Sequence, residues 1–181
     1  MMSPEWLTAA GTLGTFVVIA ASAVAALMQL RHMGRGNQIA AYNECRETMD
    51  STEFRNALYF IRTLLPQRLR DDPAICDEIL RGGFAGEYGG IRLVANLIES
   101  MGLFVRTGMM DERIACELWS GIVLDTWNSL RPLIAVVRKD YSPGVWTNFE
   151  YMTVLAKRFN KQFPDGEYPA GVERLPLDEP A

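Results

Sequence analysis

The hydrophobic pattern of the chain is dominated by one uninterrupted apolar run, WLTAAGTLGTFVVIAASAVAALMQL, over residues 6–30. At about 1.5 Å of rise per residue a helix of this length reaches roughly 37 Å, which exceeds a hydrocarbon core of about 30 Å. The Ser-Pro-Glu sequence at positions 3–5 is typical of a helix start. The pattern therefore predicts one transmembrane helix with its span at 6–30.

The charges on either side of this run predict its orientation. Trp6 lies where an interfacial aromatic is expected, and Arg31, His32 and Arg35 follow the run directly, whereas the only earlier charge is Glu5. A cleaved signal peptide usually has its positive charges before a shorter apolar core. We therefore expect a single-pass protein of the inner (cytoplasmic) membrane, with the N-terminus outside and the C-terminal domain in the cytoplasm.

Four small residues form a stripe along the predicted span. Ala10 and Gly14 are four apart, Ala21 and Ala25 are also four apart, and the two pairs are eleven apart. Small side chains at this spacing let a second helix approach closely within a bilayer, either from another copy of the chain or from another membrane protein. An alanine-rich segment also produces such spacings by chance, so the stripe is a candidate helix–helix contact.

Beyond the span, apolar residues recur at helical spacing. Gly34 and Gly36 are expected to loosen the exit from the membrane, after which residues 38–49 continue as helix. The sequence at 50–53 is typical of a capping box with Asp50 as the cap, and the helix that follows should close at Pro66. Four further helices are expected at about 73–81, 87–105, 112–131 and 143–163, the third of them capped by Asp111 and kinked or ended by Pro132, and the last opened by Ser142 and Pro143.

Residues 164–181 are rich in Pro and Gly and show neither a helical nor a strand period. The predicted fold is therefore all-α: one N-terminal transmembrane helix, an irregular bundle of about five helices and an extended C-terminal tail. We expect an anchor at 1–33, a cytoplasmic helical domain at 34–163 and a tail at 164–181.

Composition narrows the function without identifying it. Removing Glu5 from the 22 acidic residues leaves 21 against 18 Lys and Arg, so the part after the span carries a net charge of about −3. A weakly acidic domain without a basic stripe has no electrostatic attraction to nucleic acid. The three widely spaced cysteines favour small buried residues in a reducing compartment over a disulfide framework.

Few residues of the sequence are candidates for a phosphate-binding, metal or catalytic site. The Gly-rich stretch at 81–90 lacks the Lys-Ser/Thr ending of a phosphate-binding loop, and the single histidine, His32, lies at the membrane interface. We therefore expect no catalytic residue, no cofactor and no metal.

Polar residues on neighbouring helices form a candidate cluster of ion pairs: Arg92, Asn96, Glu99, Arg106, Asp125 and Glu150. Such pairs more often fix helix register than perform catalysis. An enzyme with an unrecognised carboxylate–Arg site around Glu99, Asp125 and Glu150 remains the rival hypothesis. Trp146 and Phe149 are candidate partner-docking aromatics, with core packing as the alternative.

One stretch resembles a known family. The run NLIESMGLFVRTG at 96–108, followed by Asp111, is similar to a bacterial family of unknown function, DUF4760, as are Trp127, Pro132, Arg138 and the later Phe-Glu-Tyr at 149–151. Met152 departs from the leucine expected there. The resemblance covers roughly residues 6–163 and implies an N-terminally membrane-anchored small helical protein, without an activity.

Together these features favour a membrane-tethered helical interaction or scaffold protein over an enzyme. The alternative is an accessory subunit of a larger membrane complex. The expected partners are the lipid bilayer and either a second copy of the chain or another membrane protein.

Overall fold

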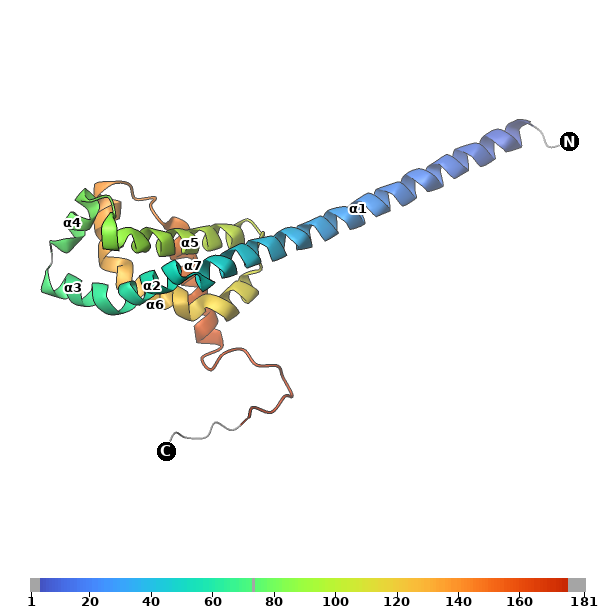
Figure 1. Cartoon of the computed structure of the whole chain (residues 1–181). Coiled ribbons are helices and arrows are strands. Elements are labelled where there is room, and N and C mark those ends of the chain that lie inside the picture. The colour runs from blue at the N-terminus through green and yellow to red at the C-terminus, as the bar shows by residue number, and fades with distance from the viewer. Residues whose placement is uncertain (1–3, 73, 176–181) are drawn as a thin grey trace. The chain divides into compact units, whose positions relative to one another are not determined.

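The computed structural model describes the backbone of residues 4–72 and 74–175, and the side chains of residues 11–29, 38–72 and 74–175. The chain divides into two compact units, residues 1–43 and 44–181. The regular structure throughout the described residues is helical, which confirms the predicted all-α class (Figure 1).

The first helix, α1 (Pro4–Asp50), begins in the first unit and ends in the second. Its Gly11–Gln29 segment is long and apolar enough to cross a membrane, and its side chains are exposed. Membrane anchors and signal sequences both contain segments of this length and composition near the N-terminus. The helix continues through Gly34 and Gly36, contrary to the expected loosening there, because a helical glycine costs only about 1 kcal/mol.

The second unit opens with a helical segment that changes pitch in its middle: α2 (Thr52–Tyr59), the π-helix η1 (Phe60–Leu64) and α3 (Leu65–Asp71). The cap of α2 is Ser51 rather than the predicted Asp50, since the Ser51 hydroxyl accepts from the Phe54 N–H at 3.1 Å.

The prediction that the helix ends at Pro66 is wrong, because Pro66 lies in the first turn of α3. Proline has no N–H to donate to the carbonyl four residues earlier, and its ring crowds that carbonyl. In η1 the Leu65 N–H bonds instead to the carbonyl of Phe60, five residues back, so a wider turn admits the proline.

The remaining elements are α4 (Ile75–Arg81), the short 3₁₀-helix η2 (Gly86–Tyr88), α5 (Gly89–Arg106), α6 (Glu112–Asp140) and α7 (Thr147–Gln162). Asp111 caps α6 as predicted, accepting from the Ile114 N–H at 3.0 Å. Of the two effects predicted for Pro132, a helix end is excluded, because Pro132 lies inside α6. Pro132 and Asn128 are both exposed, so water can bond the carbonyl that the proline leaves unpaired.

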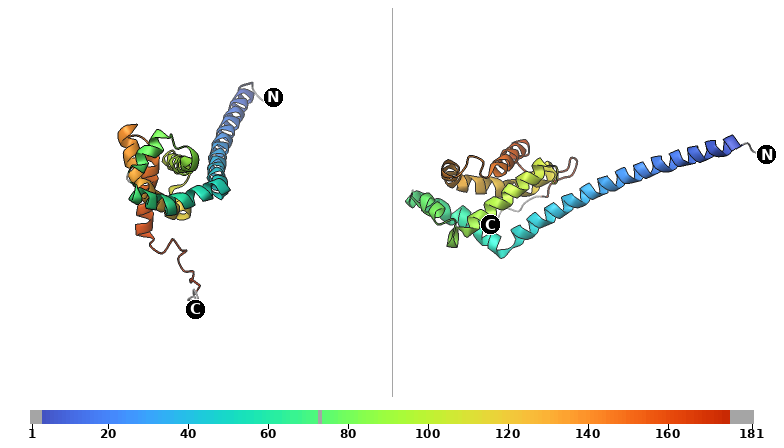
Figure 2. Two further views of the ribbon diagram at one scale, coloured as in Figure 1. Left: turned by 60° about the vertical axis from the view of Figure 1, so that its left-hand side comes forward. Right: turned by 90° about the horizontal axis from the view of Figure 1, so that it is seen from above.

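Within the second unit α7 packs against α5 and α6, and α2 packs against α5 (Figures 1 and 2). Five apolar residues that recur at helical spacing along α5 form its inner face, since Ile91, Val94, Ile98, Met101 and Val105 are all buried. Between α6 and α7 the rings of Trp127 and Phe149 meet edge to face with centroids 5.2 Å apart. The described part of the tail, 164–175, contains no helix or strand.

Candidate functional site

The largest group of bonded polar side chains that the sequence singled out lies where α7 begins, and we call it the α7 joint. Ser142 and Pro143 do not open this helix as predicted; the Ser142 hydroxyl instead accepts from the Gly144 N–H at 3.2 Å within a turn. The cap residue of α7 is Trp146, whose backbone is left-handed with φ 54°. Its side chain makes no cap hydrogen bond, so the first N–H groups of α7 need an acceptor from elsewhere.

Glu99 of α5 supplies that acceptor. One carboxylate oxygen accepts from the Phe149 N–H at 2.7 Å, and the other accepts from the Asn148 side-chain amide at 2.7 Å. A carboxylate at this end of a helix also interacts favourably with the helix dipole. Glu99 therefore caps α7 from a neighbouring helix, which assigns it a structural task in the bundle.

Two further bonds hold Trp146 in its left-handed conformation. Its indole N–H donates to the Asn96 side-chain oxygen at 2.9 Å, and its carbonyl accepts from the Arg138 guanidinium at 3.1 Å. The Phe84 ring, itself on a residue with φ 59°, meets the Trp146 ring edge on at 6.1 Å. These contacts offset the cost of a left-handed non-glycine residue.

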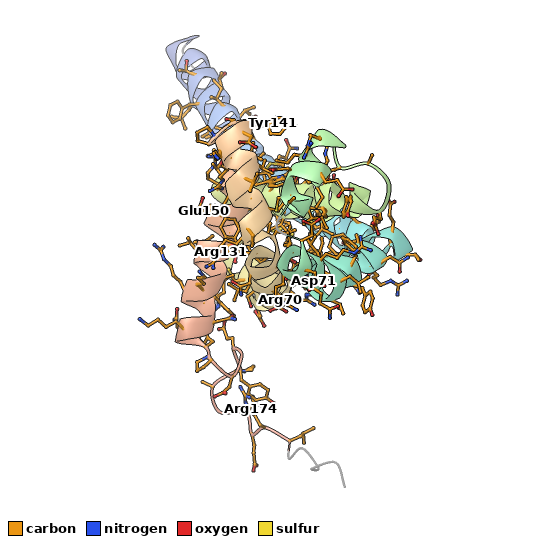
Figure 3. All side chains as sticks on the ribbon, turned by 90° about the vertical axis from the view of Figure 1, so that its left-hand side faces the viewer. Arg70, Asp71, Arg131, Tyr141, Glu150 and Arg174 are labelled. Atoms are coloured by element: carbon orange, nitrogen blue, oxygen red, sulfur yellow. The ribbon has the colours of Figure 1, made fainter. Side chains whose placement is uncertain are left out.

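Arg138 of α6 completes the joint. Besides Trp146 it donates to the carbonyl of Val145 at 2.9 Å and to the Glu150 carboxylate at 2.7 Å. Its guanidinium also lies 5.8 Å from the centre of the Trp127 ring. Glu150 on α7 is exposed. Figure 3 labels it together with Arg131 of α6. The Arg138–Glu150 pair ties the end of α6 to the start of α7.

A glycine sets the distance between α5 and α7. A Cβ placed on Gly102 would lie 2.1 Å from the Asn148 carbonyl oxygen and 2.7 Å from its carbonyl carbon. Any side chain at this position would therefore push the two helices apart. The hydrophobic pattern does not single out Gly102, although a glycine inside a helical pattern is a known sign of close packing.

The other members of the predicted cluster lie apart from the joint. Asp125 of α6 pairs with Arg62 of η1, a partner that the sequence had not suggested. Arg92 and Arg106 are exposed on α5. The three acids of the enzyme hypothesis thus have separate partners: Arg62 for Asp125, Arg138 for Glu150, and the start of α7 for Glu99.

The docking role proposed for Trp146 and Phe149 requires an exposed edge. Trp146 is 8% exposed and Phe149 is 0% exposed, so both rings pack within the bundle. Burial of these two rings stabilises the packing of α7 against its neighbours. Core packing was the alternative interpretation of these aromatics.

The Gly-rich stretch at 81–90 forms turns between α4 and α5. Gly83 and Gly86 have φ of 62° and 61°, values that favour glycine. A Cβ on Gly90 would lie 2.5 Å from the Cβ of Ala57, so this glycine permits the close packing of α2 on α5. Turn geometry and helix packing therefore account for these glycines without a bound phosphate.

Arg68 of α3 ties the Gly-rich stretch to the preceding helices. Its guanidinium bonds to the Glu87 carboxylate and, at 3.3 Å, to the Tyr88 hydroxyl. The hydrogen bond from Arg68 lowers the pKa of Glu87, and the hydrogen bond to Glu87 raises the pKa of Arg68. Both groups are exposed to solvent, so we assign this pair little stability.

The three cysteines are free thiols buried in the second unit. Burial, with a smaller contribution from Glu44 and Glu112 respectively, raises the pKa of Cys45 and of Cys116 to about 11, and burial likewise raises the pKa of Cys76. Thiols of this kind are poor nucleophiles near neutral pH. Among the described residues, no group of three or more His, Cys, Asp or Glu side chains is placed to hold a metal ion.

The candidate stripe in the apolar helix lies in the first unit. Ala21 and Ala25 line a shallow apolar groove on α1, together with the larger Phe16, Val24 and Met28. A Cβ on Gly14 would meet open space, and the side chain of Ala10 lies outside the described residues. This helix surface is free to receive a second helix, and the contact itself stays a prediction.

Comparison with known proteins gives one match. The sequence model of the family described as "Domain of unknown function (DUF4760)" matches residues 16–156, which is more than half of the chain. No curated protein and no solved structure matches.

Proposed function

We propose that this chain, which belongs to the DUF4760 family, is a single-pass membrane protein whose helical domain docks another protein in the cytoplasm. The family carries no assigned activity, so the proposal stands on the residues of the chain itself. It describes an interaction or scaffold module that is confined to a bilayer by its N-terminal helix.

The observation that carries the proposal is the exposed apolar surface of Gly11–Gln29. Eight large apolar side chains of this segment are more than half exposed, among them Leu13 at 71% and Phe16 at 74%. Covering a side chain of this size is worth about 1.5–3 kcal/mol, so the segment gains on the order of 10–20 kcal/mol on leaving water. A hydrocarbon core supplies that cover along the whole helix.

The flanking charges support the orientation. The basic residues Arg31, His32 and Arg35 follow the span, and they favour a cytoplasmic location for what comes after it. Because basic residues flank a span on its cytoplasmic side, we infer that the membrane is the inner (cytoplasmic) membrane.

Reporter fusions at the C-terminus test both anchoring and orientation. We expect a fluorescent-protein fusion to be active and an alkaline phosphatase fusion to be inactive, with the full-length chain resisting carbonate extraction. The intact mass separates an anchor from a signal sequence, because a signal sequence is removed from the mature chain. An active phosphatase fusion or a chain lacking its first 30 or so residues would contradict the proposal.

The docking role is supported by the structural tasks of the polar residues in the second unit. Glu99, Arg138 and Glu150 hold helices together at the α7 joint, and Asp125 of α6 is paired with Arg62 of η1. Neither this cap nor these two ion pairs leave a carboxylate free to act as a general base in the described geometry, which favours binding over catalysis.

Affinity purification from mildly solubilised membranes at native expression tests the docking role. A stoichiometric partner is the expected result, and recovery of the chain alone counts against it. An accessory subunit of a larger complex would in addition lose stability when that complex is deleted.

The span can contribute to such a contact through Ala10, Gly14, Ala21 and Ala25. Replacing Gly14 by Ile should weaken association in a membrane two-hybrid assay, because a branched side chain keeps the helices apart. Gly11→Ile is a matched control three residues away, since a Cβ also meets open space there. Equal association of both variants and the parent would remove the stripe from the proposal.

A further inference from the structure

A groove of about 400 Å³ lies between the first turns of α6 and the last turns of α7. Leu155, Phe159 and Phe163 give it apolar walls, and the Cys116 thiol lines it while being only 1% exposed. Its charged lining is balanced between two acids at the start of α6 and the cations Arg113 and Arg158. Phe163, the last of these walls, is also the residue at which the tail begins.

The tail that follows is folded on itself. The Gly166 N–H donates to the Phe163 carbonyl at 3.1 Å and turns the chain. Farther along, the Arg174 guanidinium donates to the carbonyls of Asp165 at 2.9 Å and Gly166 at 3.3 Å, and lies 4.9 Å from the Tyr168 ring centre. Arg174 therefore closes residues 165–174 into a loop, which we call the strap; Figure 3 labels Arg174 within it.

The strap is attached to the groove by one ion pair. Arg113, on the groove lining, donates its Nε–H to the Glu167 carboxylate at 2.8 Å and bonds the other carboxylate oxygen through a second guanidinium nitrogen. The Glu167 side chain is 16% exposed and that of Arg113 is 69% exposed, so the glutamate is largely covered whereas most of the arginine is in contact with solvent.

Two physical properties follow from this geometry. The two-pronged arrangement fixes the position of the strap, since both carboxylate oxygens are engaged. The exposure of Arg113 makes the pair weak and sensitive to salt, because water and counter-ions compete for the guanidinium. The Arg113–Glu167 pair therefore fixes one geometry but contributes little free energy, so it opens at a low cost.

We propose that the Arg113–Glu167 pair is a releasable tether between the strap and the groove lining, and that this tether gates the groove between α6 and α7. When the Arg113–Glu167 pair is made, it holds the base of the tail, and with it Phe163, against the groove. When the pair breaks, Arg113 loses its carboxylate partner and the Phe163 side chain can move away from the groove. The Cys116 thiol then becomes more accessible to solvent. The gate requires only contacts within the second unit, so it is independent of the membrane role proposed above.

Cys116 is a native residue of the groove lining, so its modification reports on the gate without an introduced cysteine. The full-length protein in detergent is treated with N-ethylmaleimide under native conditions, and peptide mapping follows the modification of each cysteine separately. Cys45 and Cys76 are also buried but do not line the groove, so they serve as internal references for opening of the whole bundle.

Removing either charge should raise the modification rate of Cys116 alone. We expect Glu167→Gln and Arg113→Gln each to raise it about two- to fivefold, the range that loss of an exposed pair allows. Glu173→Gln is the matched control, because Glu173 lies in the same strap and its side chain is exposed. The double variant R113E/E167R should return the rate toward that of the parent.

Salt gives a second readout. Raising the ionic strength to about 1 M should increase the Cys116 rate in the parent and leave it unchanged in the Glu167→Gln variant, in which no pair remains to be screened. An unchanged Cys116 rate in both single variants would overturn the gate. So would an equal rise at all three cysteines, because that result would assign the pair to the stability of the whole bundle.

Discussion

Replacing Gly102 by Ala adds a single methyl group at the closest approach of α5 and α7. The new Cβ would lie 2.1 Å from the Asn148 carbonyl oxygen, where ordinary van der Waals contact begins at about 3.4 Å. The two helices must therefore separate locally by about 1 Å, or α5 must rotate. Either movement lengthens the two hydrogen bonds, both 2.7 Å, through which Glu99 caps the start of α7.

The cost can be worked from these contacts. Overpacking of a well-packed core costs about 1–3 kcal/mol, and weakening hydrogen bonds to a charged group adds about 1–3 kcal/mol. The higher helix propensity of Ala returns about 1 kcal/mol. We therefore expect Gly102→Ala to lower the free energy of unfolding by about 1–5 kcal/mol.

The measurement is urea unfolding of the full-length protein in detergent, followed by tryptophan fluorescence. Gly121→Ala in α6 is the matched control, because Gly121 is also helical but a Cβ there meets nothing within 4 Å. This control should gain about 0.5–1 kcal/mol from helix propensity alone. If Gly102→Ala is as stable as the parent or as Gly121→Ala, the close contact of α5 with α7 is wrong.

Three further predictions concern buried and bonded groups. Glu99→Ala should lower the free energy of unfolding by about 2–3 kcal/mol, and Glu99→Gln by less, because an amide oxygen still accepts one bond; urea midpoints at constant m-value compare them. Thr126→Val should raise it by about 1 kcal/mol in the same assay, since the Thr126 hydroxyl is buried without a partner; a loss of stability would indicate a bond to that hydroxyl. Burial raises the pKa of Cys45 and Cys116 from 9.0 to about 11, so the stability that these thiols contribute is complete below pH 9 and is lost as the pH rises toward 11. A Cys45→Ala/Cys116→Ala double variant should show a flatter fall across that interval, and an equally steep fall would assign the pH dependence to other groups.

The sequence predicted those features that depend on local pattern. The apolar helix, the inner face of α5 from Ile91 to Val105 and the Asp111 cap each follow from residues close together in the chain. A period of 3.6 residues and a capping side chain are local signals, so the tertiary fold could confirm them without changing them.

The helix ends at prolines were the weakest predictions. Pro66 and Pro132 both remain inside helices, the first through a π-turn and the second on a solvent-exposed face. Proline breaks a helix only if its missing hydrogen bond cannot be compensated, and the compensation depends on packing and exposure that the sequence does not display.

The partners of the polar residues were decided by the tertiary structure. The sequence indicated that Glu99, Asp125 and Glu150 would need partners, but it did not indicate that Glu99 would cap α7 or that Asp125 would pair with Arg62. These pairs join residues about 50 to 63 positions apart, and their choice depends on the interhelical distances that Gly102 and similar contacts set. Local chemistry along the chain thus determined which elements form, whereas the close approach of helices distant in sequence determined which side chains meet.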